Sequence, residues 1–292
     1  MSPVQLPVSA KPVDIKDLDL DRNKRIGGGR YGIVYEGRFR DKSIAVKDIQ
    51  IMKEKTTNLT QILNELSISN IVHHPNIVHS LGYVIEDEDS SYNLLLLLEL
   101  VNGKNLSNLL IDSKFKEEFE ITEASKYDIL CDVAKAIAHL HSYRPPIIHG
   151  DIKPANIMIT RCKKVKLCDL GTSKVKYDSS MSMATTALVK GTPLYLAPEQ
   201  LLSSKTSSTK TDIYSFGVTI YEIVFEEHIF NVRDKDELIQ TIEDGKVNEV
   251  LYSKQSDPYC VIISTCLSKE PSVRPNAENL LNKLFKLREM KT

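Results

Sequence analysis

Three groups of residues have the types and spacing needed for chemistry on a phosphate compound, and the first is rich in glycine. Residues 27–34 read Gly-Gly-Gly-Arg-Tyr-Gly-Ile-Val and fit the pattern Gly-x-Gly-x-x-Gly-x-Val. Glycines let the backbone approach a polyphosphate closely and present N–H groups with no Cβ in the way. A Rossmann dinucleotide turn is the alternative, but it requires a helix directly after the glycines. Because the β-rich residues 33–35 follow instead, the pattern predicts a phosphate-binding β-hairpin.

The second group is a lysine with a candidate acidic partner. Lys47 ends the β-rich run 44–46, fifteen positions after Gly32. A lone lysine at a strand end is usually solvated, but at this spacing its ammonium could reach phosphate oxygens. Such a lysine needs an anchor, and Glu65 on the following helix is the natural candidate.

The third group combines two acids and an asparagine. Residues 149–156 read His-Gly-Asp-Ile-Lys-Pro-Ala-Asn, and residues 167–171 read Leu-Cys-Asp-Leu-Gly. Asp151, Asn156 and Asp169 supply the hard oxygen ligands that Mg²⁺ prefers, with nucleotide phosphates as further ligands. Any one of these residues could simply cap a turn, but the set together predicts a magnesium–nucleotide site.

The elements expected to position these groups fall into two parts. Before a connector at residues 101–104, the pattern predicts mainly strands, and the spacing of apolar residues in one stretch predicts a single helix. The expected elements are strands within 18–51, 77–85 and 92–100 and a helix at 59–72. After the connector the periodicity is helical, most clearly at 124–141, 211–225 and 259–267. A ligand is expected in the cleft between the two parts.

Composition limits the classes of partner. The 292 residues carry 38 basic and 39 acidic side chains, so a net charge of −1 gives no drive toward nucleic acid or an anionic membrane. The apolar run 94–98 is far too short to span a bilayer. Five cysteines without a Cys-x-x-Cys pair favour reduced thiols over disulfides or zinc. We therefore expect a soluble, cytoplasmic protein without membrane insertion.

From about Leu18 to its C-terminus the chain resembles a eukaryotic-type protein kinase domain, because several motifs agree in order. They are the glycines at 27–32, Lys47, Glu65, the loop 149–156, Asp-Leu-Gly at 169–171, Ala-Pro-Glu at 197–199, residues 212–217 and Arg-Pro at 274–275. The resemblance implies an α+β, bilobal kinase fold, with a small antiparallel β-sheet lobe that has one main helix and a larger helical lobe. Its expected parts are an N-terminal tail at 1–17, an N-lobe at 18–100, a hinge at 101–104 and a C-lobe at 105–292.

The resemblance also assigns roles to residues. Gly27, Gly29 and Gly32 would cover the phosphates of ATP, while Lys47 would contact the α- and β-phosphates and pair with Glu65. The remaining nucleotide-binding positions would be Ile26, Val34, Ala45, the gatekeeper Leu98, the hinge residues Glu99 and Val101, and Cys168.

Catalysis would fall to four residues. Asp151 would accept the proton of the acceptor hydroxyl, and Lys153 would touch the transferred phosphate. Asn156 and Asp169 would hold Mg²⁺. Glu199 and Arg274 would form a buried ion pair with a purely structural role.

The acceptor class follows from the same resemblance. Lys153 and residues 191–199 are typical of serine/threonine kinases that use Mg·ATP on protein substrates. The subgroup is either the tyrosine-kinase-like group, with its receptor-interacting, Pelle-type and mixed-lineage kinases, or relatives of the T-LAK cell-originated kinase. A pseudokinase that acts as a nucleotide-binding scaffold is the alternative function. An activating partner or homodimer contact is also expected.

Two departures from the family pattern bear on regulation. Gly150 replaces the arginine that normally grips a phosphorylated activation-loop residue, so activity should depend weakly on such phosphorylation. Ser69 and Ser80 take positions usually held by larger hydrophobic residues. The active arrangement should therefore be only marginally preferred.

Overall fold

The computed structural model describes residues 12–29, 32–52, 66, 68–170, 173–175, 194–202 and 207–291. It divides the chain into two compact units. The first comprises Met1–Asn102 and Cys168–Ser173, and the second comprises Gly103–Leu167 and Lys174–Thr292.

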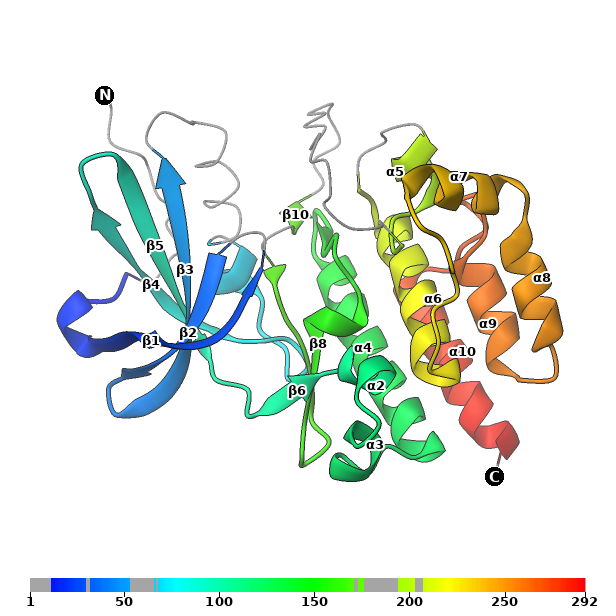
Figure 1. Ribbon diagram of the computed structural model, residues 1–292, viewed down its shortest axis with the longest axis horizontal. Coiled ribbons are helices and arrows are strands. Elements are labelled where there is room, and N and C mark those ends of the chain that lie inside the picture. The colour runs from blue at the N-terminus through cyan, green and yellow to red at the C-terminus, as the bar shows by residue number, and fades with distance from the viewer. Residues whose placement is uncertain are drawn as a thin grey trace. The chain divides into compact units, whose positions relative to one another are not determined.

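The first unit is built on a five-stranded antiparallel sheet in the order β1-β2-β3-β5-β4 (Figure 1). Its elements are the 3-10 turn η1 (Ile15–Asp17) and the strands β1 (Leu18–Gly29), β2 (Gly32–Phe39), β3 (Lys42–Met52), β4 (Ser80–Asp87) and β5 (Ser91–Glu99). The β2–β3 connection is a two-residue turn in which Arg40 and Asp41 both have positive φ, 48° and 66°. Such a turn matches the right-handed twist of the flanking strands, which fixes their register.

The sheet buries apolar side chains on both faces because successive residues of a strand point to opposite sides. One cluster contains Ile49, Leu66, Tyr83, Leu94 and Leu96. The other contains Ile44, Val46, Val84, Leu95 and Leu97. Within the helix predicted at 59–72, residues 66 and 68–71 are helical, and residues 59–65 and 67 lie outside the described residues.

The segment before β1 docks on the edge strand β4. Val13 donates its backbone N–H to the carbonyl of Tyr83 at 2.9 Å, next to a parallel bridge between Pro12 and Tyr83. Val13, Leu18 and Leu20 also pack against the second apolar cluster. Pro12 and Val13, expected as part of a tail, thus lie along the edge strand at Tyr83.

The second unit is mainly helical, and α4, α6, α9 and α10 pack against one another (Figure 1). Its helices are α2 (Asn108–Ile111), α3 (Phe115–Glu118), α4 (Glu123–Ser142), α5 (Pro198–Leu202), α6 (Thr209–Phe225), α7 (Lys235–Glu243), α8 (Lys246–Ser253), α9 (Tyr259–Cys266) and α10 (Ala277–Lys291). Helix α6 is buried along nearly its whole length, including the carboxylates of Asp212 and Glu222. Ser208 begins it with a capping box, in which the Ser208 hydroxyl accepts the N–H of Thr211.

Short strands hold the loops of this unit. Strands β6 (Gly103–Asn105), β8 (Ile157–Thr160) and β9 (Val165–Leu167) form one sheet. Strands β7 (Ile147–Ile148) and β10 (Lys174–Val175) form another, and the turn η2 (Pro154–Asn156) precedes β8.

Two predicted boundaries differ from the observed ones. The strand expected to begin at Ile77 begins at Ser80, because Ile77 closes a turn by donating its N–H to the carbonyl of His74 at 3.1 Å. Strand β6 begins at Gly103, inside the predicted connector. Over the residues whose placement is described, no helix combines the length and apolarity needed to cross a bilayer.

Candidate active site

The glycine-rich segment forms the tip of the β1–β2 hairpin. Gly27 pairs with Val34, and Gly29 pairs with Gly32. Gly32 has φ +150°, and a Cβ added to it would lie 2.5 Å from the backbone oxygen of Asp48 on β3. Only glycine fits this position, so the hairpin tip has the small, close-lying backbone that the sequence predicted. Residues 30 and 31 lie outside the described residues.

Beside the hairpin, four predicted nucleotide-binding residues share one face of the sheet. Val34 pairs with Lys47, and Ala45 pairs with Leu98. Residues 45 and 47 lie on the same side of β3, since side chains alternate along a strand. The face that carries Val34, Ala45 and Leu98 therefore combines an apolar surface with the buried ammonium group of Lys47. The fifth predicted residue, Ile26 on β1, is 49% exposed.

The end of β5 is tied to the segment before β4. The backbone N–H of Glu99 donates to the carbonyl of His79, and the carboxylate of Glu99 accepts the N–H of His79, both at 2.9 Å. This double link fixes the backbone that leads into Val101. Cys168 is a reduced, partly buried cysteine directly before Asp169.

Within the first unit, Lys47 and Asp169 form a direct ion pair. The Lys47 Nζ lies 2.8 Å from the Asp169 Oδ1, although the residues are 122 positions apart. The Lys47 side chain is 9% exposed and the Asp169 side chain 31%. Asp169 has φ 64°, a left-handed backbone that is uncommon outside glycine and often found at functional sites. Glu65, the predicted partner of Lys47, lies outside the described residues, as does Gly171.

Within the second unit, Asp151 is held by two neighbours from its own loop. The Lys153 Nζ lies 2.8 Å from the Asp151 Oδ2. The Asn156 Nδ2 donates to the same Oδ2 and to the Asp151 backbone carbonyl, both at 2.8 Å. Asp151 and Lys153 remain 28% and 31% exposed, so this carboxylate is oriented but still accessible.

The loop itself is anchored by Asp212 in the first turn of α6. Its fully buried carboxylate accepts the backbone N–H groups of His149 at 2.9 Å and Gly150 at 2.8 Å. The His141 Nε2 lies 2.8 Å from its Oδ2. Sequence reasoning quoted Asp212 only as part of a motif and missed its role. The available signal was an acidic residue within the mostly apolar run 212–225, because buried charges need partners.

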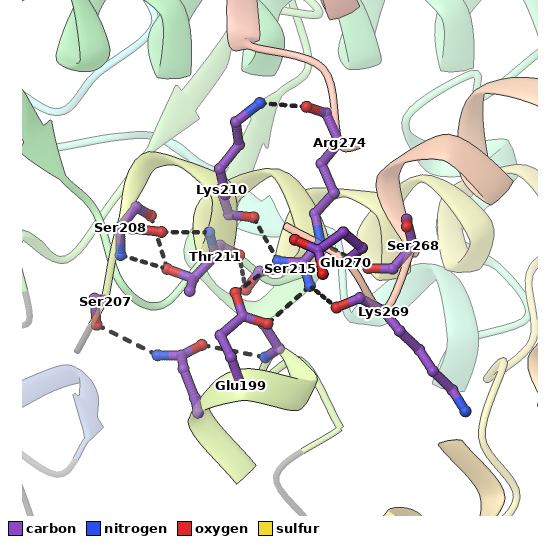
Figure 2. A network of polar contacts seen from close by, with 12 residues as sticks. Glu199, Ser207, Ser208, Lys210, Thr211, Ser215, Ser268, Lys269, Glu270 and Arg274 are labelled. Carbon is purple, nitrogen blue, oxygen red and sulfur yellow. Dashed lines mark hydrogen bonds and ion pairs between the residues drawn. The ribbon is translucent and has the colours of Figure 1, made fainter. Parts of the chain in front are cut away.

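The predicted Glu199–Arg274 ion pair is confirmed and lies in a larger polar network (Figure 2). Two parallel hydrogen bonds of 2.8 Å join the guanidinium to the carboxylate. Arg274 also donates to the carbonyls of Ser268 and Lys210, and Lys210 donates back to the Arg274 carbonyl. Burial, with the positive charge of Arg274 nearby, lowers the pKa of Lys210. The network ties α5 to α6 and to the segment before α10.

Neither unit alone contains every predicted catalytic residue. Asp169 belongs to the first unit, and Asp151, Lys153 and Asn156 belong to the second. Over the described residues, no group of three or more His, Cys, Asp and Glu side chains forms a metal site by itself. Burial raises the pKa of Cys131, Cys260 and Cys266, the last to about 12, which disfavours the thiolate form that reacts.

Comparison with known proteins gives consistent matches. A family profile described as "Protein kinase domain" matches residues 20–286. "Serine/threonine-protein kinase CTR1" of Arabidopsis thaliana is 28% identical over 281 residues, which cover 96% of this chain and 33% of that protein. "Dual specificity protein kinase shkA" of Dictyostelium discoideum is 29% identical over 274 residues, covering 94% and 50%. A "Putative serine/threonine-protein kinase/receptor R826" of Acanthamoeba polyphaga mimivirus is 31% identical over 206 residues, covering 70% and 12%. The chain thus spans at most half the length of these relatives.

Proposed function

Because the chain belongs to the protein kinase domain family, we propose that it transfers the γ-phosphate of Mg·ATP to serine and threonine hydroxyls of protein substrates. The comparisons confirm the expected protein kinase fold, with its antiparallel sheet and helical parts. Relatives named as serine/threonine and dual specificity kinases support the proposed acceptor class. The subgroup we propose is the tyrosine-kinase-like group.

The observation that best supports the activity is the ion pair between Lys47 and Asp169. Two residues 122 positions apart meet at 2.8 Å, beside a hairpin tip that tolerates only glycine at position 32. A buried ammonium that faces a carboxylate is suited to phosphate oxygens on one side and to a divalent cation on the other. Val34, Ala45 and Leu98 would supply an apolar surface for the adenine ring.

The donor set also fits Mg²⁺. The Asn156 Nδ2 is committed to Asp151, which leaves its Oδ1 as a ligand atom, and Asp169 supplies a carboxylate. Few protein oxygens and several phosphate oxygens are the usual Mg²⁺ environment. When bound, ATP would supply the phosphoryl group, and Mg²⁺ held by these oxygens would neutralise charge on the phosphates.

The chain's own residues would then position the phosphates and orient the acceptor hydroxyl. Asp151, held by Lys153 and Asn156, would align the acceptor hydroxyl and take its proton. Lys47 would fix the α- and β-phosphates, and the Lys153 ammonium would stabilise charge on the transferred group. Such positioning and charge stabilisation supply most of the acceleration in phosphoryl transfer.

An assay of purified protein with labelled ATP and a peptide library tests the proposal and identifies the acceptor sequence. We expect phosphoserine and phosphothreonine products, and a loss of at least a hundredfold in rate for Asp169→Ala and Asp151→Asn. Transfer by Asp169→Ala at a rate near that of the wild type would refute the assignment. A folded wild-type protein that binds ATP without transfer would favour a pseudokinase.

We also propose a cytoplasmic location and weak dependence on activation-loop phosphorylation, since Gly150 offers no guanidinium to a phosphate. Phosphatase treatment should change the rate less than about threefold. A large loss that maps to one site between residues 179 and 186 would contradict this. An activating partner or homodimer contact remains part of the proposal.

A further inference from the structure

A buried carboxylate in α6, that of Glu222, contacts two side chains, Tyr195 and His228. None of the roles described above accounts for this arrangement. Glu222 is 1% exposed. Its Oε2 accepts the hydroxyl proton of Tyr195 at 2.7 Å, and its Oε1 lies 2.6 Å from the Nδ1 of His228. A buried carboxylate is costly unless both oxygens have partners. Glu222 has one partner on each side, so removing either leaves an oxygen unsatisfied.

Tyr195 connects this carboxylate to the proposed chemistry. Its pKa is raised by burial, by Glu222 and by the negative charge of Asp151. The helix that holds Tyr195 also anchors the Asp151 loop, since Asp212, which accepts the N–H of Gly150, lies three residues before Ser215 in α6. Tyr195 also precedes residues 196–199, and its carbonyl accepts a hydrogen bond from the Ser215 hydroxyl at 2.7 Å. Two side chains of α6, Ser215 and Glu222, therefore hold this segment.

His228 is the solvent-facing end of the arrangement. It is 54% exposed, yet its position is defined by its neighbours in sequence. Ile229 and Phe230 are buried, and Glu227 accepts hydrogen bonds from the Tyr221 hydroxyl and pairs with Lys254. His228 is therefore exposed to solvent and at the same time fixed in place by its contact with the buried Glu222 carboxylate.

We propose that His228 is a positioning residue for the protein acceptor, acting through Glu222 on Tyr195 and the segment before α5. The inference rests on the proposed kinase function, since it concerns the site of the acceptor. His228 donates from Nδ1 and fixes the Glu222 carboxylate. That carboxylate in turn orients the Tyr195 ring and the backbone that leads into α5.

Three variants separate this role from a merely structural one. His228→Leu removes the donor, and His228→Asn keeps an amide N–H near the position of Nδ1. Asn231→Leu adds the same apolar side chain at an exposed position three residues further on. For His228→Leu we expect the KM for a peptide acceptor to rise about five- to fiftyfold, with the KM for ATP within twofold. His228→Asn should recover most of this loss, and Asn231→Leu should match the wild type.

A double substitution tests the path. If His228 acts through Tyr195, the effects of His228→Leu and Tyr195→Phe on acceptor KM should combine to less than their product. Multiplicative effects would show that His228 acts elsewhere. Equal rises in both KM values, or equal behaviour of the Leu and Asn variants, would reduce His228 to a structural residue.

Hydrogen–deuterium exchange of residues 194–202 gives a readout that needs no activity. His228→Leu should speed exchange there, and His228→Asn should restore slow exchange. Unchanged exchange in His228→Leu would overturn the inference. If the wild type transfers no phosphate, the kinase proposal fails, while the exchange experiment still decides whether His228 orders this segment.

Discussion

The hydroxyl of Ser80 is a buried polar group with no hydrogen-bond partner among the described residues. Ser69, also buried, donates its hydroxyl proton to the carbonyl of Leu66 at 3.2 Å. An unsatisfied buried hydroxyl costs free energy, whereas a bonded one contributes about 1 kcal/mol. Ser80→Ala should therefore raise the free energy of unfolding by about 1 kcal/mol.

Ser69→Ala is the matched control for this prediction, since it removes a hydroxyl that is satisfied. Urea unfolding should show no gain in stability for Ser69→Ala. If Ser80→Ala were the less stable of the two variants, the Ser80 hydroxyl would have a partner after all.

The backbone conformation at position 150 favours glycine there in place of the arginine of the kinase pattern. Its φ is 79°, in the left-handed region that side chains disfavour, while its N–H donates to Asp212. Gly150→Ala and Gly150→Arg should each lower the free energy of unfolding by about 1 kcal/mol. Gly27→Ala, where an added Cβ would meet only the Val34 side chain at 3.8 Å, should change it little. Unfolding midpoints in urea decide the matter, and an unchanged Gly150→Arg would remove the backbone argument.

At the level of single residues, the resemblance predicted much of the site but not all of it. The motif order predicted that Lys47 and Asp169 serve the same nucleotide site, but their direct ion pair was not predicted, since Glu65 was the expected partner of Lys47. His228 was not predictable, since its contact with Glu222 depends on how the chain turns after α6. That turn is made by Glu226 with φ 57°, and no glycine signals it in the sequence.

Among the elements, the C-terminal end of α6 is held by ion pairs between Glu226 and two lysines. The Glu226 carboxylate lies 2.6 Å from Lys116 of α3 and 2.7 Å from the buried Lys126 of α4. Burial by itself would raise the pKa of Glu226, but the hydrogen bonds from both lysines outweigh it, so the pKa lies below 4.5. The ionised form is thus favoured by folding, and its contribution is present at neutral pH.

Glu226→Gln should therefore destabilise the protein at pH 7, by about 1–2 kcal/mol. The difference from the wild type should shrink as pH falls below about 4.5 and the native carboxyl takes up a proton. Thermal unfolding between pH 7 and pH 3.5 measures this. Glu249→Gln, at an exposed position of α8, should show no comparable loss. A pH-independent difference would mean that packing, and not charge, holds the helix end.

Element boundaries were predictable where periodicity is strong and less so where burial comes from a turn. The helix expected at 124–141 is α4, extended by one residue at each end. Ile77 is buried yet belongs to a turn, so an apolar residue near a strand was mistaken for its start. A residue can be buried without belonging to a strand, and the pattern of apolar residues predicts burial more directly than strand formation.

At the scale of the whole molecule, the functional residues are divided between two compact units. Lys47 and Asp169 belong to the first, and Asp151 belongs to the second. Nucleotide binding should therefore depend on the first pair more than on Asp151. We expect Lys47→Met and Asp169→Asn to reduce the rise in Tm on adding Mg·ATP, and Asp151→Asn to keep it while losing transfer.

The same thermal assay without magnesium is the control for this prediction. Loss of the Tm rise in Asp151→Asn would show that Asp151 contributes to nucleotide affinity. A full rise in Lys47→Met would show that the buried ammonium does not contact the nucleotide.

The strap formed by Pro12 and Val13 along β4 has a practical consequence. A shortened chain that starts at β1 would uncover the Tyr83 carbonyl on an edge strand, and exposed edges pair readily with other chains. Such a truncation would be prone to concentration-dependent self-association. An affinity tag is accordingly better placed after α10 than fused close to Pro12.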